Sequence, residues 1–140
     1  MSTVLWANYL SDGVVTSDES DKYALYSHLD KLDGVCKSIG LSPLSELCDT
    51  TDVRFNHDEI ELPEGMESTN ELMAKQGVWR DGAQARQMLQ KLLAAVREKQ
   101  TRFGLLKNEH DAVVAELDES IAFASTAEAK NAKFNFSVVM

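Results

Sequence analysis

Three histidines and two cysteines are the side chains of this sequence most able to perform chemistry. His57 stands in the run Asn-His-Asp-Glu over residues 56–59, in which each side chain can ligate a metal ion. Imidazole and carboxylate groups together suit a divalent transition metal. We therefore consider His57 and Asp58 as candidate metal ligands, with a solvated loop as the simpler interpretation.

His28 and Cys36 invite comparison with a nucleophilic Cys-His pair, but they lie on the same expected helix. Eight residues at about 1.5 Å each separate them by about 12 Å along the axis, which is beyond hydrogen-bonding reach. Cys36 is therefore predicted to be a small core residue. The sequence does not fix the position of Cys48 relative to His28. His110 lies between two acidic residues, which is typical of the first turn of a helix.

Six acidic residues over 58–71 form a run without any Lys or Arg. Their spacing does not match an EF-hand loop, so we interpret the run as a negatively charged surface. Such a surface attracts a basic protein. Candidate partner contacts in this run are Glu59, Glu61, Glu64 and Glu67. Tyr23 and Tyr26, one helical turn apart, would anchor the same kind of interface if both are exposed.

Familiar catalytic and cofactor motifs are absent from the sequence. It contains no glycine-rich phosphate loop, no GxSxG elbow, no CxxC pair and no HExxH helix. The sequence therefore names no reaction and no catalytic residue, and we expect no cofactor.

The net charge of the 140-residue chain is −9 and is unevenly distributed. Residues 1–60 contain 11 acids and 4 bases, whereas residues 61–140 contain 12 acids and 10 bases. Such a chain repels phosphate backbones and anionic membranes, so we expect neither nucleic-acid nor membrane binding. No apolar run approaches the roughly 20 residues of a membrane span. Two cysteines do not make a disulfide framework, and we expect a cytoplasmic protein.

The elements that must position these residues centre on an amphipathic helix over residues 82–103. Asp81 is the expected N-cap, with Gln84 three residues later. Apolar residues recur at helical spacing, namely Ala85, Met88, Leu89, Leu92, Leu93, Val96 and Phe103. A second helix begins after Asn108, and its apolar stripe comprises Val113, Val114, Leu117, Ile121 and Ala124. The short connection over 104–107 predicts an antiparallel helical hairpin.

The sequence patterns at both ends of the chain predict strands. Residues 4–10 and 14–16 flank an Asp-Gly turn, which indicates a hairpin. Residues 134–140 alternate between apolar and mostly polar side chains, the pattern of a strand. Because an isolated strand is unstable, we expect the C-terminal strand to pair with the N-terminal hairpin in a sheet of two or three strands.

The middle of the chain predicts shorter elements. One helix is expected over 23–39, with Gly34 as a point where it weakens or divides. Pro43 starts a short helix that ends near Cys48. Residues 49–65 suggest an extended edge segment, and a capping box at Ser68 starts another short helix that ends at Gly77.

Together these patterns predict an α+β fold in a single compact domain over residues 1–140. It is mostly helical, with an antiparallel helical hairpin and a third helix packed on a small antiparallel sheet that joins the N- and C-terminal strands. The charge asymmetry favours a protein-protein interaction module for a basic partner, in its sharpest form an immunity-like or inhibitor-like protein. The alternatives are a non-motif enzyme or small-ligand or metal-binding protein at His57, and a homo-oligomer assembled through helical faces.

Overall fold

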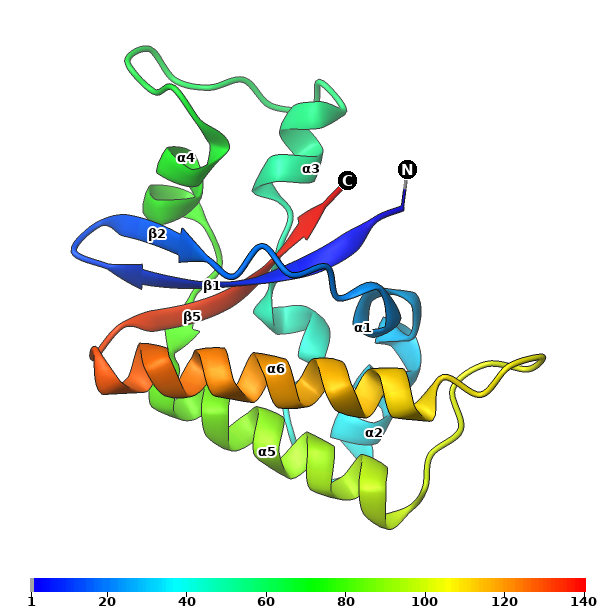
Figure 1. The fold of residues 1–140 in the computed structure, drawn as a ribbon. Coiled ribbons are helices and arrows are strands. Elements are labelled where there is room, and N and C mark those ends of the chain that lie inside the picture. Colours follow the sequence, from blue (N-terminus) through cyan, green and yellow to red (C-terminus); the bar gives the residue numbers. More distant parts are fainter. Residues whose placement is uncertain (1) are drawn as a thin grey trace.

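The two ends of the chain lie side by side at the centre of a sheet in the computed structural model, which describes residues 2–140 (Figure 1). Strand β1 (Val4–Ser11) pairs antiparallel with β5 (Lys133–Val139), from Val4 opposite Val139 to Leu10 opposite Lys133. Strand β2 (Val14–Ser17) pairs with the other edge of β1 after a turn with positive φ at Asp12 and Gly13. The predicted sheet is therefore confirmed.

Two very short strands extend the sheet beyond β5. Strand β3 (Cys48–Asp49) runs parallel to β5, and β4 (Arg80–Asp81) runs antiparallel to it. The sheet thus has five strands in the order β2-β1-β5-β3, with β4 also on β5. Our expectation of two or three strands was too small, because a strand of two residues has no alternation that a sequence can reveal.

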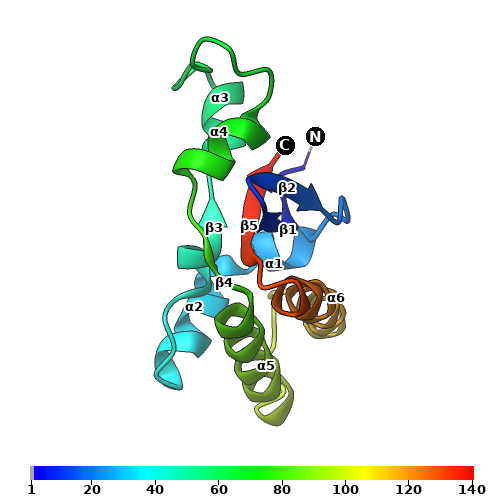
Figure 2. The same cartoon turned by 90° about the vertical axis from the view of Figure 1, so that its left-hand side faces the viewer.

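Helices α5 (Gly82–Glu98) and α6 (His110–Ala129) form the predicted antiparallel pair and cover one face of the sheet (Figures 1 and 2). Their apolar stripes are buried with the inner face of the sheet, which includes Leu5, Ala7, Phe134, Phe136 and Val138. Arg86 pairs with Glu128 and Arg97 with Asp118 across the two helices. The mixed α+β fold and its helical hairpin are confirmed.

The predicted start of helix α5 directly after Asp81 is confirmed, whereas its predicted end at residue 103 and the short connection to α6 were wrong. Helix α5 ends at Glu98 because Gln100 adopts a left-handed φ of 46° and Thr101 donates its N–H to Val96 O at 3.1 Å. The connection therefore covers residues 99–109 and is not short. Asp81 occupies the N-cap position but makes no side-chain cap hydrogen bond.

The predicted helix over 23–39 is two helices, α1 (Tyr23–Ser27) and α2 (Leu29–Ser38). The division falls at His28 and not at Gly34. The His28 ring bonds Glu109 at 2.9 Å and packs against Phe103 with ring centroids 5.4 Å apart. These tertiary contacts outweigh the weak helix preference of a glycine. A 3-10 turn, η1 (Leu44–Leu47), confirms the short helix after Pro43.

The extended edge segment expected over residues 49–65 is wrong. Asp49 belongs to β3, and its Oδ1 accepts the N–H of Thr51 at 2.8 Å, which starts helix α3 (Thr51–Asn56). A loop over 57–68 follows. Helix α4 (Thr69–Gln76) confirms the cap at Ser68, whose Oγ accepts the N–H of Glu71 at 3.3 Å. The sheet lies between the pair α3 and α4 and the pair α5 and α6 (Figures 1 and 2).

None of the helices described over residues 2–140 has the length and apolar character needed to cross a bilayer.

Candidate functional site

The outer face of the central strands carries a buried polar network. Asn8 Nδ2 donates to Asn135 Oδ1 at 2.9 Å and to Ser137 Oγ at 3.1 Å, and Asn8 Oδ1 accepts from Ser17 Oγ at 2.5 Å. Asn135 Nδ2 donates to Val78 O at 2.7 Å. Asn8, Asn135 and Ser137 are all buried. Every member thus has a partner, and the network gives this face of the sheet a fixed polar floor.

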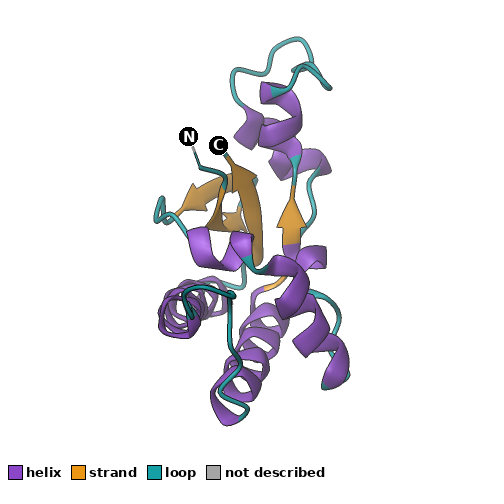
Figure 3. Ribbon diagram, turned by 90° about the vertical axis from the view of Figure 1, so that its right-hand side faces the viewer, coloured by secondary structure: helices purple, strands orange, loops and turns teal. Residues whose placement is uncertain are grey.

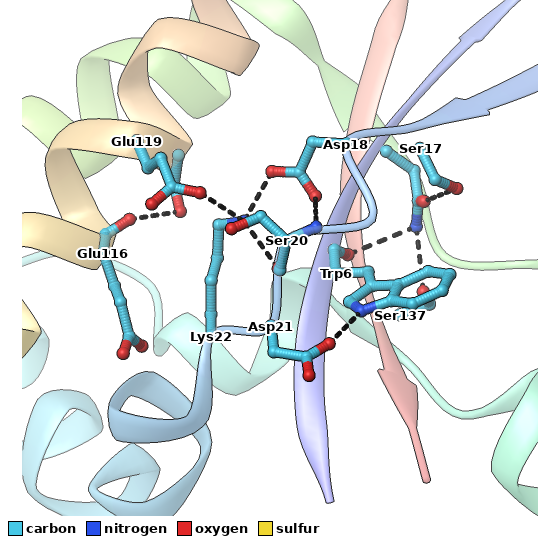
Figure 4. Close-up of polar contacts among 11 residues, drawn as sticks. Trp6, Ser17, Asp18, Ser20, Asp21, Lys22, Glu116, Glu119 and Ser137 are labelled. Carbon is cyan, nitrogen blue, oxygen red and sulfur yellow. Dashed lines mark hydrogen bonds and ion pairs between the residues drawn. The ribbon is translucent and has the colours of Figure 1, made fainter.

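The segment after β2 is fastened to this floor. Trp6 Nε1 donates to Asp21 Oδ1 at 2.7 Å (Figure 4). The buried Lys22 side chain places Nζ 2.5 Å from Asp18 Oδ2, 3.1 Å from Ser20 O and 3.6 Å from Glu119 Oε1. The positive charge of a buried ammonium group with such partners is compensated by those partners. Lys22 therefore does not offset the charge of Glu19 and Asp21, which lie beside it in the sequence.

Between the outer face of the sheet and helices α3 and α4 lies a hollow of about 640 Å³, which we call the acidic cleft. Its charged lining residues are Glu19, Asp21 and Asp52, and none of its described lining residues is a Lys, Arg or His. Trp6, Met73, Val139 and Met140 supply apolar surface, and the other lining residues are Ser2, Val4, Ser17, Thr69, Asn70 and Ser137.

The carboxylates of the acidic cleft come from opposite walls. Asp52 on α3 accepts from Thr69 Oγ1 at 2.7 Å and from Asn56 Nδ2 at 3.2 Å, so α3 and α4 hold it in place. Asp21 is held by Trp6 on the sheet side. Carboxylates on two walls around an indole ring suit an ammonium or guanidinium group, which can pair with the acids and lie over the ring.

A second hollow, of about 470 Å³, lies on the other side of the end of β5, and we call it the apolar groove. It is lined by Thr3, Tyr26, Leu29, Ser45, Cys48, Thr50, Val53, His57, Val138 and Met140. Met140 borders both hollows, and its Sδ lies 3.1 Å from His57 Nε2. The groove thus brings together Tyr26 and His57, two predicted site residues from different elements.

Cys48 and His57 both line the apolar groove, which raises the question of nucleophilic catalysis. The Cys48 thiol points to Leu44 O at 3.7 Å, and burial raises its pKa to about 12. Burial also raises the pKa of the Cys36 thiol, to about 11. An activated nucleophile requires a lowered thiol pKa. These thiols therefore have the character of structural cysteines.

Glu116 is the carboxylate whose environment opposes ionisation. It lies on α6, where its oxygens accept the N–H groups of Leu25 at 2.9 Å and Ala24 at 3.2 Å. Burial raises the pKa of Glu116 above its ordinary value of 4.5, although these two hydrogen bonds and Lys22 act in the opposite direction. The group supports the start of α1 and lies outside both hollows.

The remaining predicted site residues are exposed. Glu59, Glu61, Glu64 and Glu67 lie on the loop between α3 and α4, and none of them lines the acidic cleft or the apolar groove. Tyr23 and Tyr26 are exposed on α1. Asp58 is exposed beside His57, and residues 2–140 contain no cluster of three metal-ligating side chains. The metal site at His57 and Asp58 stays a prediction.

Sequence reasoning missed the acidic cleft because its residues had other plausible roles. Acids such as Glu19 and Asp21 ahead of a helix are typical of a helix start, and an aromatic residue such as Trp6 on a strand is most often a core residue. Asp52 lay in a segment predicted to be extended. The uneven charge of the first 60 residues was the indication available, and it located the acidity without locating the cleft.

Comparison with protein-family models, with curated proteins and with solved structures finds no match to this chain.

Proposed function

We propose that this protein is an interaction module that binds a basic protein partner through the acidic cleft. The observation that carries the proposal is the lining of the cleft: three carboxylates and an indole ring, without a lysine, arginine or histidine among the described residues. A protruding lysine or arginine side chain of a partner could pair with these carboxylates and lie over the indole ring in the same cleft.

The charge around the acidic cleft also favours a basic partner. Lys22, which directly follows the lining residue Asp21, is buried and paired with Asp18, so it does not cancel the negative charge of the cleft. The first 60 residues carry 11 acids against 4 bases, which would steer a basic partner towards this side. The sharper form of the proposal is an immunity-like or inhibitor-like protein, in which occupation of the cleft neutralises a basic enzyme. We also propose a cytoplasmic location, which the free thiols Cys36 and Cys48 support.

Two variants of equal charge change distinguish the cleft from the acidic loop. The cleft variant carries Glu19→Lys and Asn70→Lys, two exposed residues without side-chain hydrogen bonds among those described. The loop variant carries Glu61→Lys and Glu64→Gln. Each variant makes the net charge more positive by three units. Neither removes a buried group, so both should melt close to the parent protein.

The test is affinity capture from the native lysate with the parent protein and both variants, at low and at high salt, read by mass spectrometry. We expect one stoichiometric basic protein that is released at high salt and is not captured by the cleft variant. If the cleft variant still captures the basic protein and the loop variant does not, the binding site lies on the acidic loop. Capture of no basic partner by the parent protein would contradict the proposal.

A further inference from the structure

The connection between α5 and α6 exposes two adjacent leucines completely. Leu105 and Leu106 have relative exposures of 96% and 102%. The segment over residues 104–107, which we call the leucine tip, projects from the body of the protein (Figure 1). Adjacent exposed leucines on a projection are a typical feature of an interaction surface.

The conformation of the leucine tip is fixed by the residues at its base. Arg102 Nε donates to Gly104 O at 2.9 Å, and its Nη2 donates to Leu105 O at 2.8 Å. Asn108 Oδ1 accepts the N–H of Phe103 at 3.0 Å. Gly104 has φ of +104°, and a Cβ there would lie 2.4 Å from Lys107 O. The leucines are thus presented by a loop with defined internal bonds.

The apolar groove lies across α1 from the leucine tip. Both views place α1 between the connection and the two chain ends (Figures 1 and 3). His28, at the end of α1, lies 3.9 Å from a Cβ built on Gly104, and the next residue, Leu29, lines the groove. Seven large apolar residues between positions 2 and 140 are exposed. Five of them belong to the tip, the groove or the adjoining surface of α1: Tyr23, Tyr26, Leu105, Leu106 and Met140.

The charges of the two surfaces are complementary. Residues 101–107 include Arg102 and Lys107 and no acid. Eight of the ten residues that line the groove come from the first 60 residues, which hold 11 acids and 4 bases. Asp30 and Asp58 directly follow the lining residues Leu29 and His57, and both are exposed. No described lining residue of the groove is an acid, and the exposed Arg54 follows the lining residue Val53, but acids outnumber bases in the first 60 residues from which most of the lining comes. This excess of acids around the groove complements the two cations of residues 101–107.

We propose that a second copy of this chain covers this surface, in a two-fold dimer in which the leucine tip of each copy enters the apolar groove of the other. Because tip and groove flank the same residue, His28, a two-fold axis beside α1 makes the contact twice and closes the assembly. Tyr23 and Tyr26 then face the partner near the axis. The dimer uses none of the lining carboxylates of the acidic cleft and shares only Met140 with the described lining of that cleft, so it does not rest on the proposed function.

The test is sedimentation velocity of the full chain from low to high micromolar concentration. We expect reversible dimerisation, and at least about tenfold weaker association for Leu105→Ser with Leu106→Ser. Met140→Lys should weaken association from the groove side. Val14→Ser changes an exposed apolar residue on the far hairpin and should leave it unchanged. Thermal unfolding of each variant checks that the fold is retained.

Mixing the leucine variant with the Met140→Lys variant sharpens the test. Each alone lacks both reciprocal contacts, whereas a mixed dimer regains one intact tip in one intact groove, so the mixture should associate more tightly than either variant. A parent protein that is monomeric at high micromolar concentration overturns the proposal, as does a leucine variant that dimerises like the parent. Leucine-dependent flotation of a monomer with vesicles of phosphatidylserine and phosphatidylcholine would overturn it in favour of a lipid surface.

Discussion

The two faces of strand β5 differ in chemistry from Phe134 to Ser137. Phe134, Phe136 and Val138 point into the apolar core shared with α5 and α6, whereas Asn135 and Ser137 join the buried polar network of the outer face. At the end of the strand the same alternation continues: Val138 lines the apolar groove and Val139 lines the acidic cleft.

This difference shows that one strand both builds the core and separates the two proposed binding surfaces. Because side chains alternate with a period of two, a slip of one residue in the pairing of β1 with β5 would exchange the two faces. The polar network on the outer face opposes such a slip, since a shifted register would bury asparagines among phenylalanines. The hydrogen bonds of Asn8 therefore contribute to specificity as well as to stability.

Truncation after Lys133 is the strongest way to break the comparison, because it removes both faces at once. Strand β5 pairs with β1, β3 and β4. Loss of several buried apolar side chains, each contributing about 1.5–3 kcal/mol, should abolish cooperative unfolding in a domain of marginal stability. Circular dichroism during heating would show this. A truncated chain that melts like the parent would contradict the central position of β5.

Phe136→Ala tests the inner face alone. Phe136 is fully buried and packs edge-on against Phe134, with ring centroids 5.2 Å apart. The cavity should lower the free energy of unfolding by about 3–5 kcal/mol. Urea denaturation gives this value, and a loss below about 1 kcal/mol would mean that the inner face is not the principal core.

Asn8→Ala tests the outer face and should have a smaller effect. It leaves Ser17 Oγ and Asn135 Oδ1 without their partner. Buried polar groups that lose a hydrogen bond cost about 1–3 kcal/mol, so we expect a decrease in that range by urea denaturation. If Asn8→Ala were as stable as the parent, water would satisfy these groups and the outer face would be less enclosed than described.

Glu116→Gln tests a carboxylate on the inner side of the sheet, for comparison with the carboxylates of the acidic cleft on the outer side. We expect its effect on stability to be the smallest of those predicted here. The folded-state pKa of Glu116 lies above its ordinary value of 4.5, so folding favours the protonated carboxyl group. The stabilisation that follows from this is fully present at a pH below 4.5. This stabilisation is lost as the pH rises through the raised pKa. The stability advantage of the parent over Glu116→Gln should therefore shrink from acidic towards neutral pH.

Melting temperatures of the parent and Glu116→Gln across this pH range measure the difference. Glu98→Gln changes an exposed carboxylate on α5 and serves as the control. A difference between parent and Glu116→Gln that is constant with pH would show that burial does not perturb Glu116.

Periodicity predicted the parts of the fold in which one face is buried over many residues. The stripe from Ala85 to Val96 and the alternation over 134–140 both carry that information. The same reasoning failed where tertiary contacts decide the backbone, as at His28, whose contacts with Glu109 and Phe103 divide a helix. It also failed for β3, because two residues acquire their strand conformation from β5 and not from their own pattern.

The binding surfaces were less predictable than the fold. The residues that meet in the acidic cleft, Glu19, Asp21 and Asp52, come from the segment after β2 and from α3, and no spacing rule connects them. Predicted contacts such as Glu61 were selected from a contiguous run, which identifies charge but not concavity. Tyr26 and His57 were selected separately, and the packing of α1 against β1 and of α3 against β5 brings them to one groove.

The most direct test of the central claim is calorimetric titration of the captured basic partner into the parent protein and the cleft variant, at two salt concentrations. We expect the cleft variant, Glu19→Lys with Asn70→Lys, to bind the partner at least about tenfold more weakly than the parent at low salt. At high salt the two dissociation constants should differ less. The loop variant, Glu61→Lys with Glu64→Gln, should bind like the parent. Equal dissociation constants for the parent and the cleft variant at both salt concentrations would contradict the claim that the acidic cleft is the binding surface.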